Sequence, residues 1–170
     1  MFMKRNFLFS TAALFFVLVI GCNRISKYPI DDPARLKIDN TLLGKWVMKE
    51  DTSKLNYFIV KKKNDFKYAV TYMNKWGTHI QYEDFEMFLS KVSYTRFLNV
   101  QYYYESVQGY FFLKLIDINE TGDTITTAEV ADTTLSEITK PAEVRGRINR
   151  NLDNPLFFAD TAHFYKVKGF

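Results

Sequence analysis

Short runs rich in Tyr, Phe, Val and Thr recur from Leu42 onwards and are separated by Asn, Asp and Gly. In residues 66–73, FKYAVTYM, a large side chain occupies every second position. Successive side chains of a strand point to opposite faces, so this period of two is typical of a strand with one buried face. Repeated runs of this kind predict an all-β fold. The expected strands lie at 45–50, 56–63, 66–73, 78–91, 95–104, 109–118 and 123–130, with a closing strand at 162–167.

The connections between these runs predict an antiparallel meander. KNDF at 63–66 is short enough for a hairpin, and NETGD at 119–123 supplies Gly122 for a left-handed turn position. About eight strands must hide their edges, and closure into a barrel is the usual solution. Such a barrel is wide enough inside for side chains or for one small ligand.

Residues 132–152 interrupt the strand pattern and predict a helical insertion before the last strand. Asp132 or Thr133 can cap a helix, and Leu135 and Ile138 have helical spacing. Pro141 either ends this helix or begins a second one, because proline fits only the first turn.

The first residues have the features of a targeting segment. Lys4 and Arg5 precede a hydrophobic stretch from Phe7 to Ile20. A spanning helix needs about 20 apolar residues and a signal-peptide core about 7–15, so this length favours a signal peptide. We therefore divide the chain into a signal peptide (1–21), a lipidated cysteine with a flexible tether (22–40) and a β-barrel domain (41–170).

Val19-Ile20-Gly21-Cys22 resembles the lipobox of bacterial lipoproteins, with Ile20 in the place of the usual small residue. The resemblance implies that the Cys22 thiol carries a diacylglycerol and that its freed amine is acylated as well, for example with palmitate. Two or more acyl chains give stable membrane anchoring. The alternative is an inert cysteine in an uncleaved anchor helix. Cys22 is the only cysteine in the chain, which excludes an intramolecular disulfide.

The residues after Cys22 predict the membrane and the side of it. Bacterial lipoproteins that stay in the inner membrane resemble one another in an aspartate directly after the cysteine, where this chain has Asn23. Surface-exposed lipoproteins of some bacteria resemble one another in carrying acidic residues soon after the cysteine, whereas the first acid here is Asp31. We expect a domain anchored to the outer membrane and facing the periplasm. The tether contains Pro29 and Pro33 and would span about 25 Å as a flexible coil, although Ile30, Leu36 and Ile38 could dock part of it.

The charge of the mature chain is close to balanced. The 23 basic residues less Lys4 and Arg5 leave 21, against 19 acidic residues, which does not favour nucleic-acid binding. Residues 22–75 hold 12 basic and 6 acidic side chains, and residues 76–170 hold 9 and 13. One explanation is that strands of opposite net charge lie side by side in the sheet. The functional alternative is a basic face, centred on Lys61, Lys62 and Lys63, that is turned toward anionic headgroups.

Gly44-Lys45-Trp46 opens the first strand and resembles the Gly-x-Trp motif of lipocalins. The resemblance extends over the layout of residues 42–168 and implies a lipocalin-like barrel. In that family the tryptophan fills the closed end under a basic residue from late in the chain. This chain departs from the family in placing its helix before the last strand and in lacking a matching late arginine. Gly44 and Trp46 are therefore expected to be structural residues.

Catalytic patterns are scarce in this sequence, and we expect no enzyme, no cofactor and no metal site. His79 and His163 are far apart in the predicted topology. Asp84 and Glu86 share one face of one strand, as paired carboxylates can, but also as a solvent-facing stripe does. No nucleophile elbow, phosphate loop or zinc-binding helix motif occurs.

Aromatic residues are the one compositional excess. Five of the 29 precede Cys22, which leaves 24 in the mature chain. We expect a small apolar ligand in a barrel cavity lined by Tyr72, Phe85, Tyr102 and Phe112. The alternative is a solid core in a structural accessory subunit that docks on a membrane protein complex. An envelope hydrolase is the third hypothesis. The expected partners are the membrane, through the acyl chains, and either an apolar ligand or an envelope protein.

Overall fold

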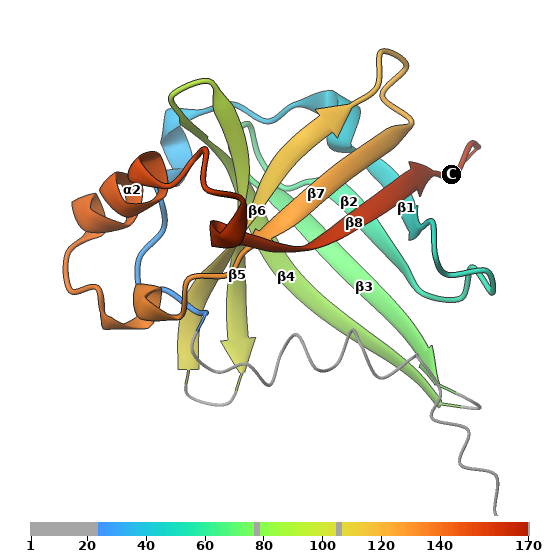
Figure 1. The fold of residues 1–170 in the computed structure, drawn as a ribbon. Helices are drawn as coiled ribbons and strands as arrows, with labels where there is room; N and C mark the ends of the chain where they lie inside the picture. The colour runs from blue at the N-terminus through green and yellow to red at the C-terminus, as the bar shows by residue number, and fades with distance from the viewer. Residues whose placement is uncertain (1–23, 77–78, 105–106, 170) are drawn as a thin grey trace, which may run out of the picture.

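The computed structural model describes residues 24–76, 79–104 and 107–169, which form a closed antiparallel β-barrel (Figure 1). Its eight strands pair in chain order, and the last returns to pair with the first. The predicted meander, its closure into a barrel and the helix before the last strand are confirmed. The strands are β1 (Gly44–Met48), β2 (Tyr57–Lys62), β3 (Tyr68–Trp76), β4 (His79–Val92), β5 (Thr95–Tyr104), β6 (Val107–Ile118), β7 (Thr124–Val130) and β8 (Phe158–Lys166).

One α-helix and several 3-10 turns complete the fold. Asp132 caps the turn η4 (Thr133–Glu137), as predicted, because its side chain accepts a hydrogen bond from Thr134 N at 3.0 Å. Pro141 begins the helix α2 (Pro141–Arg150), where its missing N–H is not needed. The remaining turns are η2 (Pro33–Arg35), η3 (Asn40–Leu42) and η5 (Pro155–Phe157).

The strand order gives the barrel two distinct ends. The β2–β3, β4–β5 and β6–β7 connections lie at one end together with η3, and we call this the capped end. The β3–β4 and β5–β6 hairpins lie at the other end with the β1–β2 and β7–β8 connections, and we call this the hairpin end.

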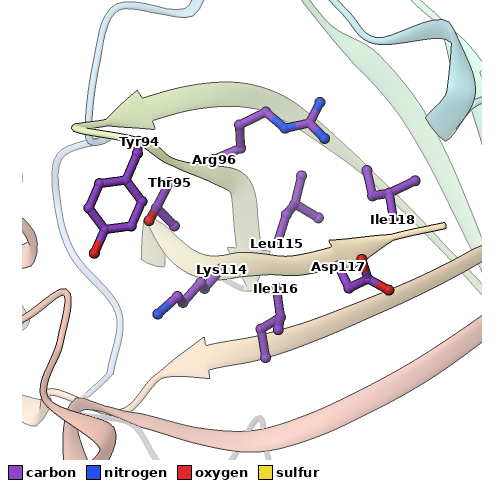
Figure 2. A pocket seen from close by; sticks show the side chains of 8 residues that line it. All are labelled: Tyr94, Thr95, Arg96, Lys114, Leu115, Ile116, Asp117 and Ile118. Atoms are coloured by element: carbon purple, nitrogen blue, oxygen red, sulfur yellow. The ribbon is translucent and has the colours of Figure 1, made fainter. Parts of the chain in front are cut away.

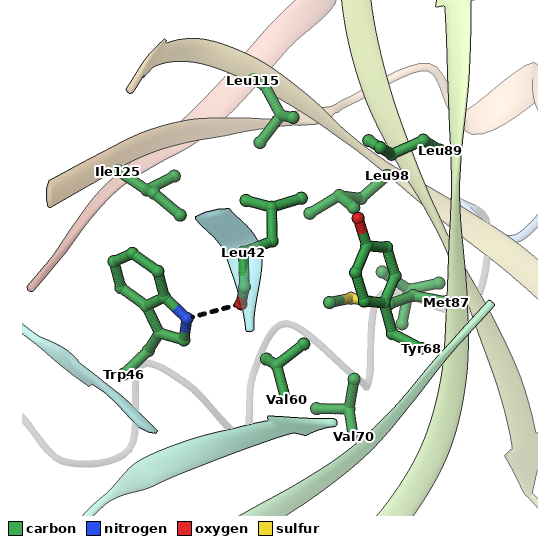
Figure 3. Close-up of a cluster of buried hydrophobic side chains, with 11 residues drawn as sticks. Leu42, Trp46, Val60, Tyr68, Val70, Met87, Leu89, Leu98, Leu115 and Ile125 are labelled. Carbon is green, nitrogen blue, oxygen red and sulfur yellow. Dashed lines mark hydrogen bonds between the residues drawn. The ribbon is translucent and has the colours of Figure 1, made fainter. Parts of the chain in front are cut away.

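Apolar side chains fill the interior around Trp46, toward the capped end (Figure 3). Trp46 is buried, and its indole N–H donates to the carbonyl oxygen of Leu42 at 2.8 Å. The other buried members of this core are Val60, Tyr68, Val70, Met87, Leu89, Leu98, Val100, Leu115 and Ile125. This half of the barrel is therefore packed with side chains.

A second apolar cluster lies on the outer face of β4–β7, beneath α2. The helix contributes Val144 and Ile148, which lie four residues apart on one face and are fully buried. Their buried partners are Ile30, Val92, Phe97, Phe112, Val130, Leu135, Leu152 and Phe157. The central strands are consequently covered on both faces.

The segment 24–42, which we call the N-terminal strap, packs along the barrel. Ser26 exchanges two backbone hydrogen bonds of 2.8 Å with Tyr110, beside the part of β6 that extends beyond β7. Farther along the strap, the backbone N–H of Ile30 donates to Asn99 Oδ1 at 2.8 Å. The sequence predicts a flexible tether over 22–40. The structure differs over 24–40 because partners distant in the sequence satisfy the polar backbone of the strap.

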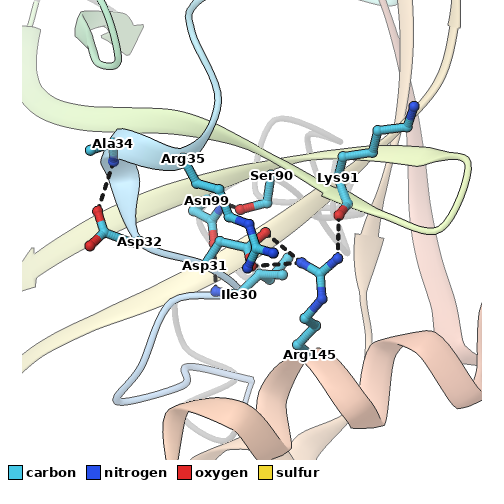
Figure 4. Close-up of polar contacts among 9 residues, drawn as sticks. All are labelled: Ile30, Asp31, Asp32, Ala34, Arg35, Ser90, Lys91, Asn99 and Arg145. Carbon is cyan, nitrogen blue, oxygen red and sulfur yellow. Dashed lines mark hydrogen bonds and ion pairs between the residues drawn. The ribbon is translucent and has the colours of Figure 1, made fainter.

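A buried carboxylate holds the middle of the strap to α2 (Figure 4). Both carboxylate oxygens of Asp31 accept from Arg145 Nη1 at 2.6 Å, and Arg35 donates to one of them at 3.1 Å. Arg145 also donates to the backbone carbonyl of Lys91 at 2.8 Å. The Asp31 side chain is 4% exposed, so this contact joins strap, helix and β4 in a protected place.

The end of the strap reaches the capped end. Asp39 N donates to the Tyr68 hydroxyl at 2.7 Å, and Ile38 N donates to the carbonyl of Asp65 at 3.0 Å. Leu36 and Ile38 pack against the interior core. Among the described residues, no helix is long and apolar enough to cross a bilayer.

Candidate functional site

Four half-buried rings gather inside the barrel toward the hairpin end, and we call them the aromatic cluster. Phe58 lies at its centre and stacks on Tyr72, with ring centroids 4.6 Å apart. Phe85 and Phe164 meet the Phe58 ring edge-on, at 6.5 and 5.9 Å. The rings come from β2, β3, β4 and β8. The cluster therefore joins strands on both sides of the β1–β8 pairing that closes the barrel. These stacked and edge-on contacts are the arrangements that aromatic pairs prefer.

The Tyr72 hydroxyl is the polar group of the aromatic cluster. Burial raises the pKa of Tyr72 to about 12, and the negative charges of Glu83 and Asp51 act in the same direction. The hydroxyl therefore stays protonated at neutral pH and can donate a hydrogen bond.

A buried carboxylate lies on β7 at the hairpin side. Glu129 is 8% exposed, and its register partner Leu113 belongs to the barrel interior. Arg24 Nη1 lies 3.7 Å from Glu129 Oε1 and donates to Asp160 Oδ2 at 2.9 Å. Burial raises the pKa of Glu129, and the nearby Arg24 guanidinium offsets part of this rise. The first described residue of the chain is thus fixed by charge at this end.

The structure brings together two of the four residues predicted to line a cavity. Tyr72 and Phe85 both belong to the aromatic cluster. Phe112 instead lies in the outer cluster beneath α2, while its neighbour Phe111 packs toward the interior. The grouping of Phe112 with the interior residues is corrected accordingly. Tyr102 pairs with Gly109 through its backbone, but its side chain lies outside the described residues.

Gly44 begins β1, Trp46 is buried two residues later, and Lys166 lies against both. Gly44 has a φ of +130°, which side chains rarely adopt, and the Lys166 side chain passes beside it. The Lys166 ammonium lies 4.8 Å from the centre of the Trp46 ring. The late basic residue at this place is thus a lysine and not the arginine that the lipocalin resemblance implies. Its place next to the C-terminus, in the closing strand, is the signal that could have found it.

The structure has two shallow clefts, of which one includes Phe164 of the aromatic cluster in its lining. The cleft at the capped end has a volume of about 330 Å³ and runs between β5 and β6 (Figure 2). Its lining mixes Arg96, Lys114 and Asp117 with aliphatic side chains, and Arg96 is already paired with Asp39 at 2.6 Å. The other cleft, of about 340 Å³, includes Lys49 and His163. Neither presents converging groups typical of catalysis.

The polar residues considered for chemistry lie apart or are already engaged. Asp84 accepts from the Thr71 hydroxyl at 2.6 Å, and Glu86 pairs with Lys63 and Lys67 on the outer face. His163 contacts Thr126, whereas His79 begins β4 at the hairpin end. No group of three His, Cys, Asp or Glu able to hold a metal occurs in the part of the chain that the structure describes.

The basic run at the end of β2 lies at the capped end. Lys62 pairs with Asp65 at 2.6 Å, and Lys63 pairs with Glu86. Arg24, which is two residues from Cys22, lies at the opposite end. A basic face centred on Lys61 and its neighbours would therefore lie at the end of the barrel opposite Arg24, and ion pairs neutralise part of its charge.

Comparison of the chain with protein-family models, with curated proteins and with solved structures finds no match.

Proposed function

We propose that this chain is a lipid-anchored β-barrel module of the bacterial cell envelope that binds a small apolar molecule at the aromatic cluster. The arrangement of Phe58, Tyr72, Phe85 and Phe164 carries the ligand proposal, because these rings are large, apolar and only half-buried. Phe58, Phe85 and Phe164 pack against the core around Trp46, so a ligand at the aromatic cluster would lie beside that core. The role needs no catalytic group and no cofactor.

Dye binding tests the ligand proposal. The uncharged dye N-phenyl-1-naphthylamine is titrated into the purified chain that begins at Asn23, whose folding is checked by cooperative thermal unfolding. Phe85→Ser is expected to weaken binding at least about tenfold, because a buried phenylalanine ring contributes about 1.5–3 kcal/mol. Phe112→Ser is the matched control, since it removes the same ring from the outer cluster. Absence of saturable binding by the unmodified chain would reject the ligand proposal.

The anchor is proposed on the lipobox resemblance at Cys22, which lies outside the described residues. Cys22→Ser should abolish incorporation of labelled palmitate and leave the chain unprocessed after Gly21. The whole-protein mass should show the diacylglycerol on the unmodified chain alone. Equal labelling of both chains would contradict lipidation at this residue.

The proposed location is the periplasmic side of the outer membrane. Tyr94 lies in the β4–β5 turn at the capped end and is 70% exposed, so a cysteine placed there is accessible. A membrane-impermeant maleimide should label Tyr94→Cys only after the cells are permeabilised. Labelling of intact cells would place the domain on the cell surface.

A structural accessory subunit is the second candidate, and the filled core favours it. Side chains occupy the interior around Trp46, while Ile80 and Tyr82 are exposed at the hairpin end. Exposed apolar residues of this size often mark a contact with another molecule. This candidate predicts the same anchor but no dye binding, so the dye titration separates the two alternatives.

A further inference from the structure

Large apolar side chains are exposed at the hairpin end of the barrel, while Tyr94 and Ile116 are exposed at the capped end. Ile80 and Tyr82 lie on β4 beside the β3–β4 hairpin and are 53% and 63% exposed. Tyr103 lies near the β5–β6 hairpin and is 59% exposed. Leu55, in the β1–β2 connection, is 40% exposed. These residues come from three separate connections at one end of the barrel.

The chain is attached to its anchor at the same end. Arg24 is held by Asp160 at the start of β8, and Ser26 is held by Tyr110 in β6. Cys22 precedes Arg24 by two residues, which span at most about 7 Å. The anchor therefore joins the barrel at the hairpin end, both for a lipidated Cys22 and for an uncleaved apolar segment 7–20.

The capped end cannot take the place of the hairpin end at the membrane. A strand of 14 residues such as β4 is about 46 Å long at the usual rise per residue. A link of about 7 Å does not allow the barrel to turn its far end toward the bilayer. The membrane is thus the surface that the exposed residues of the hairpin end meet first.

The chemistry of the hairpin end suits the bilayer interface. Tyrosine rings carry an apolar body and a polar tip, and they are enriched at the headgroup level of membranes. The charges there are mixed, since Lys49 and Lys54 lie close in sequence to Glu50 and Asp51. Apolar insertion, rather than attraction to anionic headgroups, is the expected mode of contact.

We propose that the hairpin end rests in the interfacial layer of the membrane that anchors the chain, with Ile80, Tyr82 and Tyr103 among the headgroups. This inference rests on the anchor proposed above and names the bilayer as the partner of these residues. It also orients the barrel, because the aromatic cluster then lies on the membrane side. An apolar ligand would enter from the lipid without crossing water.

Single introduced cysteines test this orientation. Lipidation uses the thiol of Cys22, the only cysteine of the chain, so Tyr82→Cys and Tyr103→Cys each offer one free thiol. Tyr94→Cys is the matched control, because Tyr94 is an equally exposed tyrosine at the capped end. Each purified lipidated chain is labelled with a bimane dye and placed in phosphatidylethanolamine–phosphatidylglycerol vesicles that contain a spin-labelled lipid.

The proposal predicts several-fold stronger quenching at positions 82 and 103 than at position 94, with little change on adding salt. Equal, weak quenching at all three positions of a chain whose mass shows the diacylglycerol would overturn the orientation and leave the anchor intact. A mass without the lipid would overturn the anchor itself. Shielding of position 82 in native membranes, but not in vesicles, would assign the surface to a protein partner and reject the lipid contact.

Discussion

The ammonium of Lys166 lies over the Trp46 ring and donates a hydrogen bond to the carbonyl oxygen of Thr41 at 2.6 Å. The two contacts join the last strand, the first strand and the end of the strap at one place. The capped end is therefore closed by residues from both ends of the folded chain, and each of them can be tested separately.

Trp46→Ala is expected to lower the free energy of unfolding by about 3–5 kcal/mol, because it removes the largest side chain of the interior core. Urea unfolding measures the loss. In a Trp76→Phe background, emission comes from Trp46 alone and should be blue-shifted, since the ring is 4% exposed. Emission typical of a solvated indole would contradict the burial of Trp46.

Lys166→Met should cost about 1 kcal/mol, the usual size of a half-buried cation–π contact. Methionine keeps the apolar stem that passes beside Gly44 and removes only the charge and its hydrogen bond. Lys168→Met is the control, because Lys168 is exposed and lies two residues away. Equal effects of the two substitutions would show that the contact with Trp46 contributes nothing specific.

Asp31→Asn is expected to destabilise the fold by about 2 kcal/mol, because it weakens charge-assisted hydrogen bonds to Arg145 and Arg35 in a protected place. Asp32→Asn is the neighbouring control. Asp32 is exposed and accepts from Ala34 N at 2.8 Å, and asparagine keeps this cap. Urea midpoints that move together for the two variants would rule out a special role for Asp31.

Glu129→Gln should stabilise the protein at neutral pH. Burial raises the pKa of Glu129 above its ordinary value of 4.5, despite the attraction of Arg24, so ionisation of this group opposes folding. The gain should shrink as the pH falls through the raised pKa and vanish below 4.5, where folded and unfolded states are both protonated. Unfolding measured across this pH range tests the sign.

Asp132→Asn provides the opposite case. Burial alone would raise the pKa of Asp132, but hydrogen bonds from Thr134 and Arg147 bring it below its ordinary value of 3.8. Its carboxylate therefore stabilises the fold above 3.8, and this contribution disappears as the pH falls through the lowered pKa. The variant should be less stable than the unmodified protein at neutral pH and equal to it in strong acid. Parallel pH profiles for the two variants would contradict both assignments.

Gly109→Ala should displace the start of the strap. A Cβ at this position would lie 2.2 Å from Ile25 Cγ2 and 2.9 Å from the carbonyl oxygen of Ser26, so backbone must move, at a cost of about 1–3 kcal/mol. Gly146→Ala, in α2, should instead stabilise by about 1 kcal/mol, because a Cβ there meets only the flexible Arg150 side chain at 3.4 Å. Faster proteolysis near residue 26 in Gly109→Ala alone would report the displacement.

The barrel could be predicted because its strands obey simple local rules. In β3 the period of two is clear, and the turns at 63–66 and 119–123 have the required residues. Asp132 and Pro141 mark the interruption before the last strand by capping and by proline geometry. None of these signals depends on a partner far away in the sequence.

Which side chains of β6 point into the barrel could not be predicted in the same way. Phe111 and Phe112 are adjacent and both apolar, because β6 is covered by the interior core on one face and by α2 on the other. A strand buried on both faces loses its alternation, so the sequence does not say which ring points inward. For this reason the sequence wrongly predicts Phe112, together with Tyr72 and Phe85, as a residue of the barrel interior.

The strap escaped prediction for a different reason. Its sequence is polar, and only Ile30, Leu36 and Ile38 suggest docking. What orders it are specific hydrogen bonds, such as those from Ile30 N to Asn99 and from Arg145 to Asp31, across large separations in sequence. Composition alone describes such a segment as a tether.

The pairing of Ser26 with Tyr110 also decides how the protein bears force. A pull applied through Cys22 reaches the contacts of Arg24 with β8 and of Ser26 with β6 first, so these contacts carry the load first. Asp31 and Asn99 act as the next attachment points. Tension would therefore detach the strap stepwise, from the hairpin end toward the capped end. The closed ring of strands would stay intact until the force reaches Thr41 and Trp46.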